Sequence, residues 1–251
     1  MVDLNAPVWK TLYSAGNDAE KWLGRLLSGE AEFREVMEIL GEDLSHQLSW
    51  YSATAYVLPH LAVFCKKLSP EERMFLVGQI GPAIAAAESE NGLPPDTEDF
   101  RELQEGLDGL RPLVQDLIRN HQDTLDAAGP EEQQMFALGA LAVLGNRRHA
   151  YDLFLLSAYC WEEGHAACAC GWNNECFPLG EKPGCLKPAG IAPWDGQSLA
   201  DEAVWFSGLP SRFGDEEILP VLPLVYGTGT CPECGKEEPY WTWLDRFMKD
   251  Y

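Results

Sequence analysis

Apolar residues recur every three or four positions through most of the first 160 residues, the spacing that places them on one face of an α-helix. Glycine and proline separate these stretches, and no alternating strand pattern lies between them. The pattern predicts about eight short amphipathic helices joined by short turns. We expect the first two over 18–28 and 30–44. A third begins at about Trp50, where Pro59 kinks or shortens it, and a fourth runs from Ser69 to an interruption at Gly81-Pro82. Further helices are expected across 100–117, from Gly129 to Asn146, and over 148–161.

Two of these helix starts carry capping signals. In Ser69-Pro70-Glu71-Glu72, a capping serine precedes a proline at the first helical position and a glutamate at the third. The run Gly129-Pro130-Glu131-Glu132 has the same proline and glutamate positions and opens the next expected helix. A helix is therefore predicted to begin at each proline.

The apolar residues of 100–117 alternate between spacings of three and four, like a coiled-coil seam. The seam covers fewer than three heptads, and both Gly109 and Pro112 fall inside it. Because proline removes a helical hydrogen bond and glycine weakens a helix, we expect two shorter helices here.

Short paired helices that each expose one apolar stripe can bury it by stacking on the next pair. Residues 1–162 are therefore predicted to form an all-α, helical-repeat domain with the architecture of an αα-superhelix. A compact helical bundle is the alternative, because exact internal repetition is weak.

The composition changes after Glu162. Residues 164–197 are rich in Cys, Gly, Pro and Asn and have almost no apolar periodicity, so burial of a core cannot order them. A bound metal is the simplest alternative. We expect residues 163–251 to form a zinc-stapled part with further helices over 199–209 and 216–225 and a short aromatic helix near the C-terminus, packed on the same solenoid.

Four of the eight cysteines have the spacing of metal ligands. Cys231-Pro232-Glu233-Cys234-Gly235 is a zinc knuckle by sequence, because proline sets the turn and glycine permits the left-handed backbone that faces N–H groups to the sulfurs. Zinc prefers four ligands, and the nearest second pair is Cys168 and Cys170, followed by Gly171. We predict one structural Zn²⁺ held by Cys168, Cys170, Cys231 and Cys234.

Other ligands and other chemistries stay open. His165, Cys176 or Cys185 could replace one of the four cysteines, whereas Cys65 and Cys160 fall on apolar helix faces and are interpreted as core residues. A redox pair normally opens a helix after a strand, a setting that Cys231 and Cys234 lack. A catalytic zinc would keep an open position, which four cysteines do not leave.

The net charge of −22 narrows the classes of partner. Forty acidic against eighteen basic side chains repel nucleic acids and anionic membrane surfaces and attract a basic protein. The alternative interpretation, which we favour, is that the acidity only keeps the protein soluble. No stretch reaches the roughly 18–20 apolar residues of a membrane span, and the first residues lack the pattern of a secretory signal. We therefore expect a cytoplasmic protein, whose reducing environment favours metal-bound cysteines over disulfides.

A pattern between Trp22 and Leu61 resembles bacterial HEAT-repeat proteins of uncharacterised function. It comprises a tryptophan-leucine helix, an amphipathic helix, and His46-Gln47-x-x-x-Tyr51-x-Ala53-x-x-x-Val57-x-Pro59-x-Leu61. The run from Leu224 to Gly235, which contains the Cys-Pro-x-Cys-Gly knuckle, is similar to a tail found in some of the same group. The resemblance implies a HEAT-like αα-superhelix and a protein-interaction role, and it implies no reaction. Residues 112–150 depart from clear repeats, which leaves the number of units open.

Two functional predictions follow. The first is a non-enzymatic scaffold or adaptor that presents an acidic helical surface to a protein partner. The second is a metal- or carboxylate-dependent enzyme with a cleft between the solenoid and the cysteine-rich part. His46, Gln47 and His60 could be polar anchors for a ligand, but we favour a bracing role at helix turns. The sequence lacks the phosphate-binding, zinc-protease, nucleophile-elbow and dinucleotide motifs.

Overall fold

The structure is a computed structural model of the whole chain. It describes residues 6–14, 24–26, 28, 30–44, 50–88, 93–145, 147, 150–151, 154, 164–177, 190–192, 227–240, 242–243 and 246; for 130, 131, 164, 165, 174–177, 190 and 191 only the backbone is described. The chain divides into two compact units, Met1–Tyr151 and Asp152–Tyr251, which we describe separately. The domain boundary expected after residue 162 stays a prediction, because residues 155–163 lie outside the described part.

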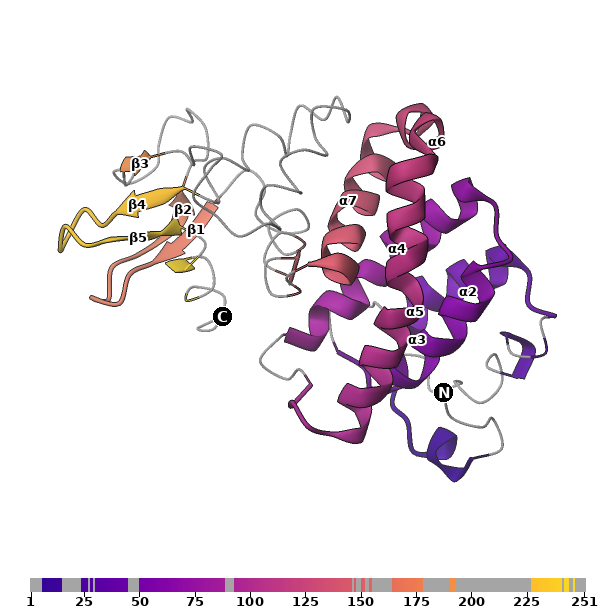
Figure 1. Cartoon of the computed structure of the whole chain (residues 1–251). Helices are drawn as coiled ribbons and strands as arrows, with labels where there is room; N and C mark the ends of the chain where they lie inside the picture. Colours follow the sequence, from indigo (N-terminus) through magenta and orange to yellow (C-terminus); the bar gives the residue numbers. More distant parts are fainter. Residues whose placement is uncertain are drawn as a thin grey trace. The chain divides into compact units, whose positions relative to one another are not determined.

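The first unit is helical, as the sequence predicts (Figure 1). A short 3-10 helix, Pro7–Lys10, precedes the longer helices; a π-helical turn, Leu40–Leu44, extends α2, and a 3-10 turn, Ala86–Glu88, extends α4. The α-helices are α2 (Phe33–Ile39), α3 (Ser52–Cys65), α4 (Pro70–Ala85), α5 (Glu98–Asn120), α6 (Gln122–Ala127) and α7 (Pro130–Leu144). The helices expected over 18–28 and 148–161 fall mostly outside the described residues. The few residues that the structure does describe in these two ranges are helical.

Both predicted helix starts are confirmed. At α4, the Glu72 N–H donates to the Ser69 hydroxyl at 3.2 Å, and the Ser69 N–H donates to the Glu72 carboxylate at 2.9 Å. At α7, the Gly129 N–H donates to the Glu132 carboxylate at 2.8 Å. Each bond satisfies a backbone group that a helix end leaves without a partner.

The predicted helix breaks at Pro82 and Pro112 are wrong. Pro82 lies inside α4 and Pro112 inside α5, which continues as one helix where two were expected. Pro59 lies inside α3, which runs to Cys65, and the kink expected at Pro59 stays a prediction. An interior proline costs roughly 3 kcal/mol, while burying one large aliphatic side chain contributes roughly 1.5–3 kcal/mol. Burial of an unbroken stripe along α5 therefore outweighs the loss at Pro112. The stripe consists of Leu103, Leu107, Leu110, Val114 and Leu117, all fully buried.

Helices that are not consecutive in the chain pack most closely. The helix α3 packs on α5, and α4 packs on α7 (Figure 1). Glycine permits both approaches: a Cβ on Gly106 of α5 would lie 2.6 Å from the Leu58 side chain of α3, and one on Gly139 of α7 would clash with the Val77 carbonyl of α4. The core of this unit therefore lies between these two close helix pairs.

The described part of the second unit consists mainly of short strands, which the sequence did not predict. Strands β1 (Gly164–Ala167) and β2 (Asn173–Phe177) form an antiparallel hairpin. Strands β3 (Gly190–Ala192), β4 (Thr228–Thr230) and β5 (Glu237–Pro239) form an antiparallel sheet in that order. The helices expected over 199–209 and 216–225 lie outside the described residues. Across the described residues the chain is still mostly helical, and none of their helices is long and apolar enough to cross a membrane.

Candidate metal centre

The first cysteine pair lies in the turn between β1 and β2. The Cys168 N–H donates to the Trp172 carbonyl at 2.7 Å, and the Gly171 N–H donates to the Cys168 carbonyl at 3.0 Å. Gly171 has a φ of 94°, a left-handed conformation that glycine adopts without strain. These bonds close a tight loop that holds Cys168 and Cys170 on one turn.

The second pair lies in the turn between β4 and β5 and is built in the same way. The Cys231 N–H donates to the Lys236 carbonyl at 2.9 Å, and the Gly235 N–H donates to the Cys231 carbonyl at 2.9 Å. Gly235 has a φ of 71°. The two turns differ by the one extra residue that separates Cys231 from Cys234. The predicted knuckle and the second cysteine pair therefore both lie in turns of β-hairpins.

The four sulfurs converge on one point. The Sγ atoms of Cys168 and Cys234 are 3.8 Å apart, as are those of Cys170 and Cys231, and all four lie within 4.8 Å of one another. A tetrahedron with metal–sulfur distances of about 2.3 Å has sulfur–sulfur edges of about 3.8 Å. A disulfide would need about 2.05 Å. The four cysteines could therefore hold one metal ion, and their spacing is not that of disulfides.

Each turn contributes one buried and one exposed thiol. Cys168 and Cys231 are buried, whereas Cys170 and Cys234 are exposed. Burial raises the pKa of Cys168 to about 12. Burial acts in the same direction on Cys231, but backbone hydrogen bonds from Cys234 and Glu233 to its sulfur, together with neighbouring thiols, lower its pKa to about 7. Since a metal ion binds thiolates, occupation of the site would displace the remaining protons.

Trp243 supports both cysteine turns from one side. Its side chain is fully buried, and its ring meets that of Trp172, from the first turn, at a centroid distance of 5.6 Å and an angle of 66°. A Cβ on Gly229 of β4 would lie 2.6 Å from the Trp243 ring, so only glycine permits this contact. Tyr240 packs edge-on against Trp243 at 6.2 Å. Trp172, Tyr240 and Trp243 therefore form a small aromatic cluster that joins the first turn to the residues after β5.

Glu238 joins this segment to the second turn. Its carboxylate accepts hydrogen bonds from Lys236 Nζ at 2.5 Å, from Trp243 Nε1 at 2.9 Å and from Arg246 at 3.2 Å. The Lys236 bond, followed by those from Trp243 and Arg246, lowers the pKa of Glu238 to about 2 against the opposing effect of burial. Arg246 also donates to the Ala167 carbonyl at 2.8 Å, next to Cys168. One chain of polar contacts thus connects the two turns.

The structure describes some of the other candidate residues completely, some by their backbone alone, and others not at all. His165 lies on β1 and Cys176 on β2, but their side chains are outside the described part, as are Cys160, Cys185, His46 and Gln47 altogether. Cys65 is a core residue, as expected, and burial raises its pKa to about 11. His60 is buried in the middle of α3 at a centroid distance of 6.0 Å from Trp9, and the bracing role expected for it stays a prediction.

Fold and site together define a mostly helical protein with four cysteines that could bind one metal ion. Comparisons of the chain with protein families, curated proteins and solved structures found no significant match. What the protein does must therefore be argued from its own residues.

Proposed function

We propose that this protein is a non-enzymatic protein-interaction scaffold whose second unit is held by one structural zinc ion. The observation that carries the zinc proposal is the pair of 3.8 Å sulfur–sulfur distances, which match the edge of a tetrahedral zinc–thiolate centre. Four thiolates fill the preferred coordination of zinc and leave no position for a substrate or an activated water. A structural role fits this ligand set better than a catalytic one.

The ion would supply stability that the second unit otherwise lacks. Its described strands are three to five residues long, and the closest sulfur pairs join residues 66 and 61 positions apart in the chain. A metal bound across such a separation contributes its binding free energy to folding. Cys168, Cys170, Cys231 and Cys234 would hold it, and Trp243, Glu238 and Arg246 would keep the two turns facing one another.

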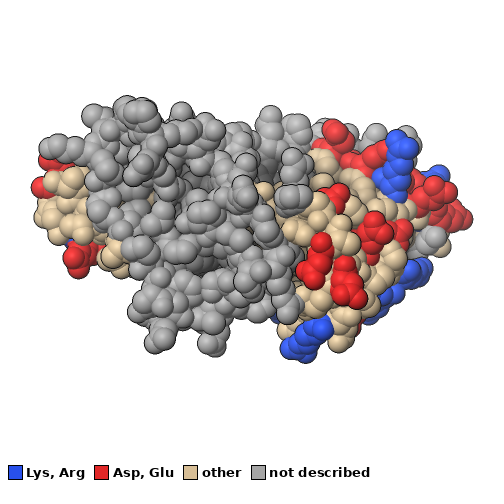
Figure 2. Space-filling model, turned by 90° about the horizontal axis from the view of Figure 1, so that it is seen from above, with Lys and Arg blue, Asp and Glu red and all other residues tan. Residues whose placement is uncertain are grey.

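The scaffold proposal rests on the first unit. If α3 and α4 form one helical repeat and α5 and α7 the next, the first helices of the two repeats pack on one another, and so do the second helices. Stacked repeats pack in this way, which supports the HEAT-like αα-superhelix that the sequence resembles. Figure 2 shows acidic side chains over the described face of the helical unit, with basic ones mainly toward its edges. With a net charge of −22, such a surface favours a basic protein partner.

The zinc proposal is tested by native mass spectrometry and elemental analysis of the purified protein, followed by chelation. We expect one zinc per chain and, after its removal, a weaker near-ultraviolet tryptophan signal, because Trp172 and Trp243 lose their fixed surroundings, with little change in helix content. One iron per chain, which a tetrahedron of thiolates also binds, would contradict the choice of metal. An unchanged tryptophan signal after complete removal would contradict the structural role.

The scaffold proposal is tested by affinity capture from a native cytosol at low and at high salt. We expect a protein with basic surface charge to be retained, and to be released when added salt screens the attraction. The captured protein should then bind the purified chain directly. Failure of any retained protein to bind directly, or binding that does not respond to salt, would contradict the proposal of an acidic interaction surface.

A further inference from the structure

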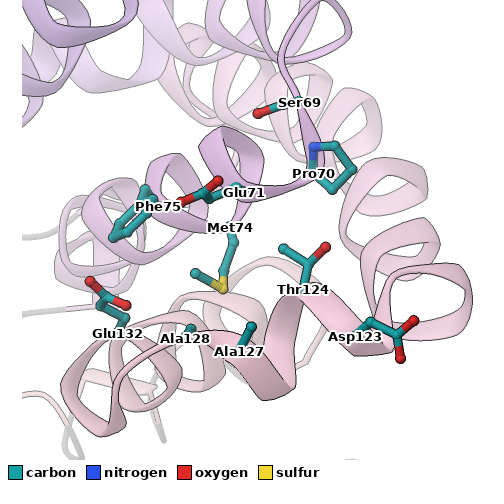
Figure 3. A pocket seen from close by; sticks show the side chains of 10 residues that line it. All are labelled: Ser69, Pro70, Glu71, Met74, Phe75, Asp123, Thr124, Ala127, Ala128 and Glu132. Atoms are coloured by element: carbon teal, nitrogen blue, oxygen red, sulfur yellow. The ribbon is translucent and has the colours of Figure 1, made fainter.

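A hollow of about 510 Å³ opens on the helical unit, where the start of α4 faces α6 and the start of α7 (Figure 3). This size falls in the range of roughly 300–1,000 Å³ that is usual for ligand pockets. Pro70, Phe75, Ala127 and Ala128 give it apolar walls, and the buried Met74 side chain, which Figure 3 shows pointing from α4 toward Ala127 and Ala128, also belongs to the lining. The hollow therefore offers apolar contact to whatever enters it.

Acidic side chains stand around these apolar walls. Glu71, Asp123 and Glu132 belong to the lining, which contains no Lys, Arg or His among the described residues. Glu132 is engaged by the Gly129 N–H at 2.8 Å. In the part of the chain that the structure describes, Glu71 and Asp123 make no hydrogen bond or ion pair, and both are exposed. Two carboxylates are thus available to a positively charged ligand.

A metal ion is not the ligand that this arrangement favours. Within the described residues, the four cysteines are the one group of three or more Cys, His, Asp or Glu side chains that converge closely enough to hold an ion. The three carboxylates of the hollow are spread around it instead. The matching ligand is a long side chain with an apolar stem and a cationic end, because stem and charge then meet different parts of the lining.

We propose that this hollow binds a lysine side chain presented by a basic protein segment. The proposal deepens the scaffold function and rests on it. The methylenes of the lysine would lie against Pro70, Phe75 and Ala128, close to the buried Met74, and its ammonium group would reach Glu71 or Asp123. The acidic surface around the hollow raises the local concentration of a basic segment and steers it toward the site. Binding of a single side chain is weak, so its test needs a signal from the hollow itself.

Met74 provides that signal. The chain has five methionines, and ¹³C-methyl labelling gives each one a separate resonance, with the Met74→Leu variant assigning the one that is lost. The probe is the blocked peptide acetyl-Gly-Ala-Lys-Ala-Gly-amide, and its control replaces lysine with norleucine, which keeps the stem and removes the charge. We expect the lysine peptide to shift the Met74 methyl resonance saturably, while Met37 of α2 stays unchanged and the norleucine peptide has at most a fraction of the effect.

The carboxylates are tested by Glu71→Gln combined with Asp123→Asn. Loss of two solvent-exposed charge contacts should raise the dissociation constant of the lysine peptide about three- to tenfold. The matched control, Glu30→Gln combined with Glu42→Gln, changes the net charge equally at exposed positions outside the lining of the hollow and should leave the constant within about twofold. The Met74 resonance of each variant also reports that α4 and α7 are still folded together.

Three results would overturn the proposal: an equal shift with norleucine, a shift of Met37 as large as that of Met74, or unchanged binding in the Glu71/Asp123 variant. None of these would decide the scaffold function, which depends on capture of a basic protein by the unmodified chain. Conversely, if a captured protein binds the Glu71/Asp123 variant as tightly as the unmodified chain, the scaffold function stands and the hollow is not its site.

Discussion

The two units of this protein differ in what their described residues bury. In the helical unit, long aliphatic stripes such as Leu103 to Leu117 of α5 are fully buried, and glycines allow helix pairs to approach closely. In the second unit, the described strands are too short to bury such stripes, and Cys168 and Cys231 are among the buried residues of its described part. The comparison teaches that extensive apolar burial stabilises the first unit, whereas for the second unit we propose that its four sulfurs, and the residues that position them, supply stability that the short strands do not.

The largest effect on this difference between the units is expected from removing one of the four cysteine ligands. Cys231→Ser should abolish tight metal binding and unfold the second unit, because structural zinc supplies roughly 10–16 kcal/mol of apparent binding free energy in small zinc-dependent folds. The helical unit should keep its secondary structure. Elemental analysis and circular dichroism of the purified variant measure both effects.

Cys65→Ala is the matched control for this substitution. Cys65 is fully buried in α3, far in sequence from the four ligands, so its loss should cost the helical unit about 1 kcal/mol and leave one metal per chain. Full metal content in Cys231→Ser, or loss of metal in Cys65→Ala, would show that the site has been assigned to the wrong cysteines.

A smaller effect is expected from Gly139→Ala, which acts on the helical unit alone. The new Cβ would clash with the Val77 carbonyl, a backbone atom that cannot move away without separating α4 from α7. Overpacking of this kind costs roughly 1–3 kcal/mol and should lower the melting temperature of the helical unit by roughly 3–10 °C. Thermal unfolding followed by circular dichroism at 222 nm measures it.

Gly24→Ala is the control for Gly139→Ala. Nothing lies within 4 Å of a Cβ at Gly24, which is exposed and helical, so the substitution should be neutral or slightly stabilising. Equal melting temperatures for Gly139→Ala and the unmodified chain would mean that α4 and α7 do not pack at this distance.

How much could be predicted from the sequence depended on how local each feature is. The capping box at Ser69 and the cysteine turns involve residues a few positions apart, and the sequence located both. The continuation of α5 through Pro112 depends on burial by other helices, so local rules predicted a break instead. Strands of three residues carry no alternation to detect. The Arg246–Ala167 bond joins residues 79 positions apart, and no local pattern could have found it.

Glu238 is the central residue of the chain of polar contacts that connects the two cysteine turns. The folded pKa of Glu238 is about 2, below its ordinary value of 4.5, so the carboxylate stabilises the folded second unit fully above pH 4.5 and loses this effect as the pH falls through 2. Glu238→Gln should therefore lower the stability of the second unit by about 1–2 kcal/mol at pH 7, an effect smaller than that of losing a ligand. Glu237→Gln, an exposed neighbour on β5, should stay within about 0.5 kcal/mol.

The pH dependence separates an ion-pair role for Glu238 from a simple loss of packing. Because the folded pKa of Glu238 is about 2 and its ordinary pKa is 4.5, the difference in stability between Glu238→Gln and the unmodified chain should stay constant from pH 7 to pH 5 and narrow as the pH falls from 4.5 toward 2. Denaturant titration followed by tryptophan fluorescence, to which Trp172 and Trp243 of this unit contribute, measures this difference. A difference that stays constant below pH 4.5 would mean that Glu238 titrates near its ordinary pKa, and that Lys236, Trp243 and Arg246 do not hold its charge. The second unit would then depend on its four sulfurs and the Trp243 contacts, without the polar chain between the two turns.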